Sequence, residues 1–120
     1  MIPDRLKVAL KGEGSAAFVT QGPDGPHLVA TWNSYLELVG DDTLVFPAGG
    51  YRKTEENLRR GSPVQMIVGG HAPQGIGFRL TGRAELEDGT PNHERVKRRF
   101  PWARAAVVLR VDSVEQVLGK

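Results

Sequence analysis

A glycine-rich segment followed by a basic residue and a hydroxyl is the stretch of this sequence best suited to chemistry. Gly49 and Gly50 follow a β-prone run and free the backbone. Lys53 and Thr54 then open a predicted helix and add a positive charge and a hydroxyl donor. The N–H groups at a helix N-terminus favour an anion, so we expect a phosphate monoester here. The alternative is a glycine turn with a capping threonine.

Two common nucleotide-binding motifs do not match this chain. The glycines before Lys53 do not have the Gly-x-x-x-x-Gly-Lys-Ser/Thr spacing of a P-loop. The pair Gly75 and Gly77 lacks the third glycine of a dinucleotide-binding fingerprint, and it precedes a predicted strand where the fingerprint needs a helix. Neither segment therefore predicts the fold that these motifs mark.

A second segment, residues 30–35, combines two aromatic rings with interleaved polar groups. Trp32 and Tyr35 can present a flat apolar surface, and Thr31, Asn33 and Ser34 carry hydrogen-bonding groups. A heteroaromatic ring system with polar edges needs that combination. The alternative is a β-strand with two aromatic core residues and polar residues facing outward.

The remaining chemistry-bearing residues form no recognisable catalytic set. His27, His71 and His93 are far apart, and none has a second histidine or a carboxylate at ligand spacing, so we expect solvated histidines and no metal site. The serines lack the context of a nucleophile elbow, and the chain has no cysteine. We therefore assign no catalytic residue.

The hydrophobic and turn patterns predict a mainly β protein with short helices. The expected helices are 4–12, 53–60 and 92–100, and the expected strands are 15–20, 27–39, 43–46, 63–68, 76–86 and 103–111. Ser113 to Gln116 has the spacing of a capping box, which predicts a final helical turn. No βαβ alternation is sustained, and closing an antiparallel sheet removes its exposed edges. We expect a small six-stranded antiparallel β-barrel with helices covering its ends.

Length and composition describe one ordinary domain spanning residues 1–120. Hydrophobic residues make up 39% and charged residues 25% of the chain, as in globular proteins. The net charge of +2 does not suggest a nucleic-acid partner. No apolar run approaches the roughly 20 residues of a membrane span, and the N-terminus does not resemble a secretory signal. We expect a cytoplasmic protein without a membrane or nucleic-acid partner.

Several motifs in order add a family resemblance. They are Gln21-Gly-x-Asp-Gly-Pro-His-Leu-Val, Thr31-Trp-Asn-Ser-Tyr-Leu, Pro47-x-Gly-Gly-x-x-Lys-Thr-Glu-x-Asn, Gly77-Phe, Trp102-Ala-Arg-Ala-Ala and Ser113-x-Glu-Gln-x-Leu. Together they resemble the small FMN-binding proteins of sulfate-reducing bacteria, which belong to the pyridoxamine-5′-phosphate-oxidase-like group of FMN-binding split barrels. The resemblance runs from Lys11 to Leu118. It implies a Greek-key-like split barrel of six antiparallel strands, a homodimer, and one FMN per subunit near the dimer interface.

The resemblance also implies roles for individual residues. Lys53 and Thr54 match the phosphate-binding pair, and Asn57 matches a polar position near the phosphate or the ribityl chain. The positions implied to surround the flavin ring are Thr31, Trp32, Asn33, Ser34, Phe46, Pro47, Ala48, Gly49, Gly50, Trp102 and Leu118. Trp102 and Leu118 could be supplied across the dimer interface, and Glu13 matches an acidic residue near the site.

One departure bears on function. Pyridoxamine phosphate oxidases end with a basic, histidine-containing substrate motif, and this chain has no Arg-x-His pair. We therefore expect a small electron-transfer protein that uses non-covalently bound FMN and exchanges electrons with an unidentified partner protein or small-molecule reductant. The alternatives are an FMN-dependent oxidase or flavin reductase of the same group, and a non-catalytic flavin-binding sensor.

Overall fold

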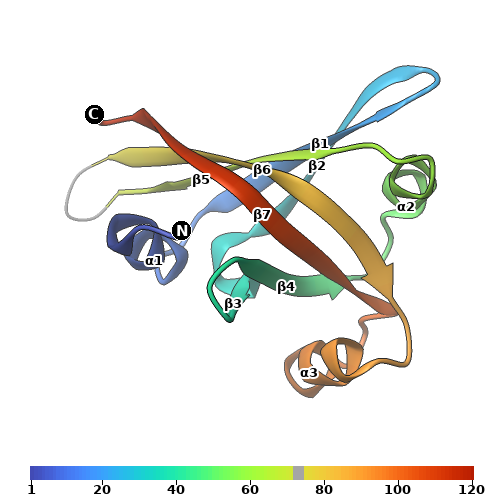
Figure 1. Ribbon diagram of the computed structural model, residues 1–120. Coiled ribbons are helices and arrows are strands. Elements are labelled where there is room, and N and C mark those ends of the chain that lie inside the picture. The colour runs from blue at the N-terminus through green and yellow to red at the C-terminus, as the bar shows by residue number, and fades with distance from the viewer. Residues whose placement is uncertain (72–74) are drawn as a thin grey trace.

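One curved antiparallel sheet with three helices around it forms the protein, as the computed structural model shows (Figure 1). The structure describes residues 1–71 and 75–120. Its elements are α1 (Asp4–Leu10), β1 (Ser15–Gly22), β2 (Gly25–Trp32), the 3-10 helix η1 (Asn33–Tyr35), β3 (Glu37–Val39), β4 (Thr43–Ala48), α2 (Arg52–Arg59), β5 (Val64–Gly70), β6 (Ile76–Glu87), α3 (Pro91–Arg99) and β7 (Ala105–Leu118). The strand order in the sheet is β2-β1-β5-β6-β7-β4-β3.

The mainly β, antiparallel prediction is confirmed, but the number of strands differs. Residues 27–39, predicted as one strand, form β2, η1 and β3, and β3 pairs with β4 at the opposite edge of the sheet. The buried side chain of Asn33 anchors the break, because its Nδ2 donates to the Gly69 carbonyl at 2.7 Å. The described residues form a sheet of seven strands where six were expected, with β2 and β3 as its edges, and closure of this sheet into a barrel stays a prediction.

The predicted helical turn at 113–116 is wrong. This segment continues β7 and pairs with β6, where Thr81 lies opposite Ser113 and Arg79 opposite Glu115. Both pairs are joined through their side chains, by a hydroxyl–hydroxyl hydrogen bond and by an ion pair. Cross-strand pairs of this kind stabilise a sheet, and one of them engages the Ser113 hydroxyl that would have capped a helix.

The core lies on both faces of the sheet near β4 and β7. Ala105 to Leu109 are all buried, because their side chains alternate between two apolar clusters. One cluster holds Ala105, Val107 and Leu109 with most of the buried side chains, and the other packs Ala106 and Val108 against Val96 of α3. A strand covered on both faces explains the continuous apolar run in the sequence.

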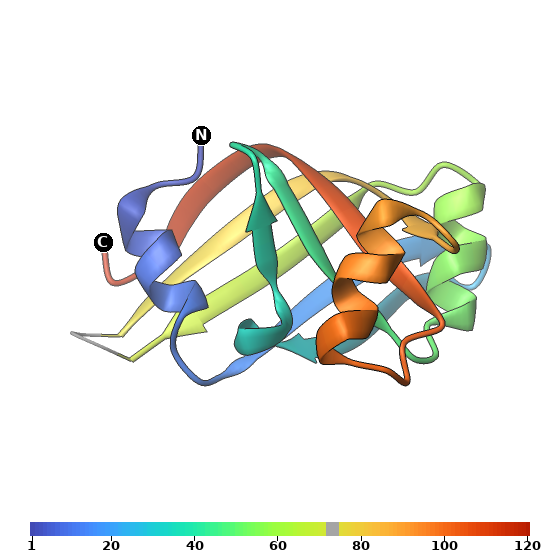
Figure 2. The same cartoon turned by 90° about the horizontal axis from the view of Figure 1, so that it is seen from below.

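The helices sit at separate places around this sheet. Figure 2 shows α1 with both termini at one end of the molecule and α2 at the other. Helix α2 follows directly from the end of β4, and Gly61, at φ 93°, ends it in the left-handed conformation that glycine adopts most readily. The predicted phosphate segment therefore lies at the end of the molecule that is far from the C-terminus.

Candidate functional site

A hollow of about 240 Å³ lies between the end of β2 and the turn that leads from β4 into α2. It is lined by Ala30, Thr31, Trp32, Tyr35, Pro47, Gly49, Gly50, Tyr51 and Trp102. Trp32 and Trp102 are 51% and 55% exposed, so both indoles offer uncovered aromatic surface. The two segments singled out in the sequence, 30–35 and 45–54, therefore meet in space.

Trp102, which lies between α3 and β7, also lines the hollow. A Cβ atom added to Gly49 would lie 3.2 Å from Cζ3 of Trp102, so the indole rests directly on the glycine backbone. Tyr35, Phe100 and Trp102 form an aromatic group in which the Phe100 ring is 4.5 Å from Tyr35 and 5.6 Å from Trp102. A larger residue at position 49 would displace the indole.

The N-terminus of α2 opens beside this hollow. The first residues of the helix are Arg52, Lys53 and Thr54, and within the described chain no side chain caps its N-terminus. The Lys53 ammonium is about half exposed and lies 3.5 Å from Asp24 at the tip of the β1–β2 hairpin. Uncapped helix N–H groups beside a lysine suit an anion, so the phosphate site expected at residues 49–54 stays a prediction that this geometry supports.

The alternative drawn from the sequence required Thr54 to cap α2, and Thr54 does not do so. It lies inside the first turn of α2 and is fully buried. Its hydroxyl has no hydrogen-bond partner among the residues that the structure describes. A buried hydroxyl without a partner is unfavourable, so this group is available to a ligand that reaches the helix N-terminus.

Tyr51 joins the two walls of the hollow, a role that the sequence did not indicate. It precedes α2 with φ 61° and ψ 34°, the one non-glycine residue at positive φ in the described chain. Its hydroxyl donates to the Ala30 carbonyl at 2.5 Å, and its ring meets Phe18 edge-on at 5.3 Å. Burial raises the pKa of Tyr51, with a hydrogen bond to Thr31 opposing that change. The neutral phenol of Tyr51 is therefore held in place as part of the lining of the hollow.

Asn57 faces β1 from the buried side of α2. Its Nδ2 donates to the Thr20 hydroxyl at 3.1 Å, while its Oδ1 is buried and has no partner in residues 1–71 or 75–120. A Cβ atom on Gly22 would lie 2.3 Å from Oδ1, so the hairpin backbone passes very close to this side chain. Asn57 thus holds α2 against the β1–β2 hairpin.

Other residues named from the sequence lie away from the hollow. Phe46 and Ala48 belong to the main core, and Asn33 is turned toward α1 and β5. Ser34 is not among the lining residues, and its carbonyl accepts from Arg99. Leu118 instead lines a separate cavity of about 260 Å³ together with Glu13 and His71. Of the predicted loop 69–75, residues 72–74 lie outside the described residues.

His93 is buried, so the expectation that it is solvated is wrong. Its Nδ1 accepts from the Gly89 N–H at 2.9 Å, and its Nε2 lies 3.0 Å from the Ala103 carbonyl oxygen. The ring therefore ties the start of α3 to the segment just before β7. Its role is to hold Ala103, and no part of the hollow contacts it.

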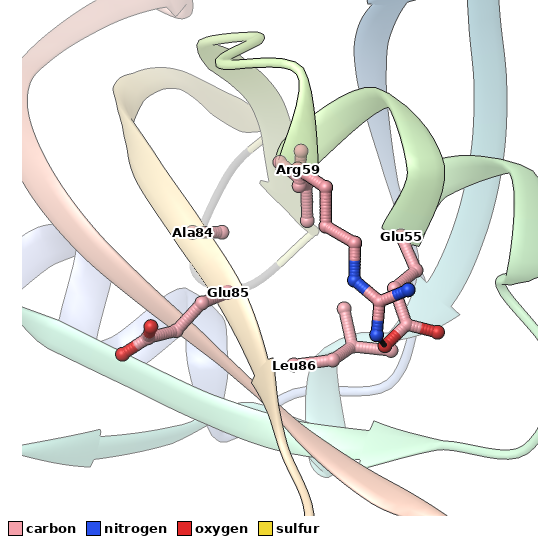
Figure 3. Close-up of a pocket in the computed structure, with 6 residues that line it drawn as sticks. Glu55, Arg59, Ala84, Glu85 and Leu86 are labelled. Carbon is pink, nitrogen blue, oxygen red and sulfur yellow. Dashed lines mark hydrogen bonds and ion pairs between the residues drawn. The ribbon is translucent and has the colours of Figure 1, made fainter.

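A larger cavity lies elsewhere, between α2 and β6. It measures about 350 Å³ and is lined by Glu55, Leu58, Arg59, Ala84, Glu85 and Leu86. Figure 3 shows Arg59 and Glu55 of α2 side by side, joined by an ion pair of 3.1 Å. Glu55 pairs with Arg59, and Glu85 pairs with Arg110 outside the cavity. Because its charged groups already have partners, this cavity offers less to a ligand than the hollow.

The described helices include none with the length and apolar character needed to cross a membrane. Comparison with known structures agrees with the fold. The chain is similar to HupZ of Group A Streptococcus, with a TM-score of 0.83 at 17% identity over 98% of this chain and 94% of that one. It is also similar to an FMN-binding protein of Syntrophomonas wolfei, with a TM-score of 0.64 at 20% identity over 88% of this chain and 78% of that one. At these identities the likeness establishes the fold.

Two sequence comparisons go further than fold. The FMN-binding protein of Nitratidesulfovibrio vulgaris (strain Miyazaki F) is 45% identical, and the alignment covers 98% of this chain and all of the relative. The family model described as pyridoxamine 5′-phosphate oxidase matches residues 2–118. This chain therefore belongs to the pyridoxamine 5′-phosphate oxidase family, as its motifs indicated.

Proposed function

We propose that this protein binds FMN non-covalently and transfers electrons between redox partners. One observation carries the proposal. Within the described residues the hydroxyl of Thr54 has no partner, and it is buried at a helix N-terminus that no side chain caps, beside an aromatic hollow. A ligand that combines a phosphate with a flat heteroaromatic ring satisfies both features. The name of the N. vulgaris relative supports FMN as that ligand.

The residues of the chain fit the parts of FMN in a defined way. Lys53, Thr54 and the helix N–H groups would hold the phosphate, and Trp32, Trp102 and the backbone of Gly49 and Gly50 would lie along the ring. Bound there, FMN would supply reversible redox chemistry that no side chain of the protein can perform. The protein binds the cofactor, orients its ring and excludes water from part of it.

Electron transfer is favoured over turnover of a substrate by the residues that line the hollow. Among the described lining residues the ionisable groups are two phenols, Tyr35 and Tyr51, and none is a carboxylate, histidine, lysine or arginine. The Tyr51 hydroxyl is already bonded to Ala30. A hollow without a free acid or base, and with exposed indoles, suits a flavin that exchanges electrons with an approaching partner.

A reconstitution experiment tests this proposal. The purified protein is examined for a flavin absorption spectrum, and the molecule released by heating is identified by mass spectrometry. We expect FMN, and we expect the reduced holoprotein to pass electrons to a one-electron acceptor without turning over pyridoxamine 5′-phosphate. Bound FAD, or no flavin after reconstitution, would contradict the cofactor. Steady turnover of pyridoxamine 5′-phosphate or of a reduced nicotinamide would favour an oxidase or reductase instead.

Thr54→Val separates ligand binding from folding. Valine keeps the shape of the side chain and removes a buried hydroxyl that lacks a partner. Without ligand, the free energy of unfolding should stay the same or rise by about 1 kcal/mol. FMN affinity should fall by roughly tenfold, since a hydrogen bond to a charged phosphate is lost. Thermal denaturation and fluorescence titration measure the two effects, and a loss of stability with unchanged affinity would contradict this role.

We also propose that two copies of the chain form a homodimer. Residues directly opposite in neighbouring strands point to the same face, so Leu28 shares one face with Val19, and Ala30 and Ile67 share it with Ala17. Leu28 is 70% exposed and Ile67 45%, which leaves the outer face of β2, β1 and β5 apolar and uncovered. This face begins beside Trp32, and pairing about a two-fold axis is the commonest way to bury such a surface.

In the proposed dimer, Leu118 of one copy would be supplied to the flavin site of the other. Leu118 is 60% exposed at the end of β7 and lines a cavity separate from the hollow of its own molecule. Removing Val117, Leu118 and the residues after them should weaken dimerisation and change flavin fluorescence together. Sedimentation velocity and fluorescence measure the pair of effects. As an independent variant, Ile67→Glu should also weaken the dimer, whereas Lys97→Glu on the exposed face of α3 should not. A monomer at micromolar concentration with FMN fully bound would refute a shared site.

A further inference from the structure

Arg104 reaches the glycine turn from a part of the chain that lies far away in sequence. Its Nε and Nη2 both donate to the carbonyl oxygen of Gly50, at 2.9 and 2.7 Å, and Nη2 also lies 3.1 Å from Glu55 Oε1. Its backbone N–H donates to the Ala48 carbonyl at 2.9 Å. Arg104, which directly precedes β7, thus binds the end of β4, the glycine turn and the first part of α2.

The bond to Gly50 controls the orientation of one peptide group. Two consecutive glycines have no side chains to hold a turn, and their backbone has more freedom to lose than that of any other residue. In a trans peptide the carbonyl and the following N–H point in opposite directions. Because the guanidinium holds the Gly50 carbonyl, the N–H of Tyr51 must point away from Arg104. The same bond therefore fixes the orientation of the peptide group that leads into α2.

Arg104 also alters the charge beside the helix N-terminus. Glu55 lies in the first turn of α2, and its side chain is only 17% exposed. Arg104 pairs with Oε1 and Arg59 with Oε2, so each carboxylate oxygen has a guanidinium partner. An unpaired carboxylate at this place would repel a phosphate dianion.

We propose that Arg104 is a positioning residue for the phosphate of the flavin: it fixes the Gly49–Gly50 turn and neutralises Glu55, so that the N-terminus of α2 can receive a dianion. This inference rests on the proposed function. Arg104 acts through the backbone and through Glu55, and it is not among the residues that line the hollow. The planar fork of arginine is needed, because two N–H groups reach the carbonyl while one also reaches the carboxylate.

The experiment compares three variants by their affinities for FMN and for riboflavin, which lacks the phosphate. Arg104→Met should lower the preference for FMN over riboflavin by about tenfold. Arg104→Lys keeps the charge and loses the fork, so it should restore the preference only in part. The matched control is Arg59→Met, which removes the other partner of Glu55 without touching Gly50, and its preference should stay within about twofold of the wild type.

Melting temperatures without ligand complete the test. A lower melting temperature with an unchanged preference for FMN, in either Arg104 variant, would show a purely structural role and overturn the proposal. An equal loss of preference in Arg59→Met would also overturn it, because charge alone would then explain the effect. If Arg104→Met does not fold, Arg104→Lys and Arg59→Met still decide between these outcomes. A wild-type protein that shows no preference for FMN would instead contradict the proposed function itself.

Discussion

Replacing Lys53 with alanine is expected to weaken FMN binding by about ten- to hundredfold, while riboflavin binding stays nearly unchanged. A charge-assisted hydrogen bond to a phosphate dianion is worth roughly 1.5–3 kcal/mol, which corresponds to that range. Lys53 lies in the first turn of α2, away from the residues that line the hollow. The loss should therefore depend on the phosphate and not on the ring. Fluorescence titration with both ligands measures it.

Asp24→Asn is the matched control for Lys53. The carboxylate of Asp24 lies 3.5 Å from the Lys53 ammonium and is itself strongly exposed, so the pair contributes little to stability. Removing this negative charge frees the lysine, and FMN affinity should stay the same or rise. Equal losses of FMN and riboflavin affinity in Lys53→Ala would show that the lysine serves folding and would contradict its role toward the phosphate.

Gly82→Ala is expected to lower the free energy of unfolding by roughly 3 kcal/mol. Among the glycines of this chain that are not at positive φ, we expect replacement by alanine to be most destabilising here. The added Cβ would lie 2.0 Å from the Arg110 carbonyl oxygen and 2.9 Å from its carbon, and both atoms are backbone. The register of β6 and β7 shifts between Thr81 and Gly82, so Asp112 is an extra residue there. The bulge brings the strands too close for any side chain.

Chemical denaturation of Gly82→Ala without ligand measures this loss. Gly12→Ala is the control, because its added Cβ would meet its nearest neighbour, the Ala9 carbonyl oxygen, at an ordinary 3.6 Å. That substitution should change the free energy of unfolding by less than about 1 kcal/mol. A Gly82→Ala protein as stable as Gly12→Ala would mean that the bulge can open at little cost.

The predictions that held are those whose physical cause is local. A helix beginning near Lys53 and ending before Gly61 follows from residues within one or two turns of each other. The hairpin between β1 and β2 follows from the glycines and prolines of its turn. The anion site expected before α2 also rests on local features, namely glycines, a lysine and the N-terminus of a helix, and it stays a prediction.

The errors share a different cause. Ser113 and Gln116 have the local spacing of a capping box, but β6 places Thr81 opposite Ser113 and Arg79 opposite Glu115, so the segment continues the sheet. Asn33 breaks the predicted strand 27–39 because its amide reaches Gly69, which is distant in sequence. His93 is buried because Gly89 and Ala103 bond both of its ring nitrogens. Thr81, Arg79, Gly69 and Ala103 are brought to these residues by tertiary packing, which no local pattern reveals.

The sequence by itself determined the family, the mainly β class and the identity of the phosphate-binding candidates, because motifs and turn chemistry are written in neighbouring residues. Only the tertiary structure brought Trp32 and Trp102 to one hollow and placed Leu118 in a separate cavity. It also bonded Tyr51 and Arg104 to the backbone around that hollow. Arg104 lies 54 positions from Gly50, and a side chain bonded to a carbonyl has no sequence signature. The free energy that fixes such a contact comes from packing the whole sheet, so it exists only once the chain has folded.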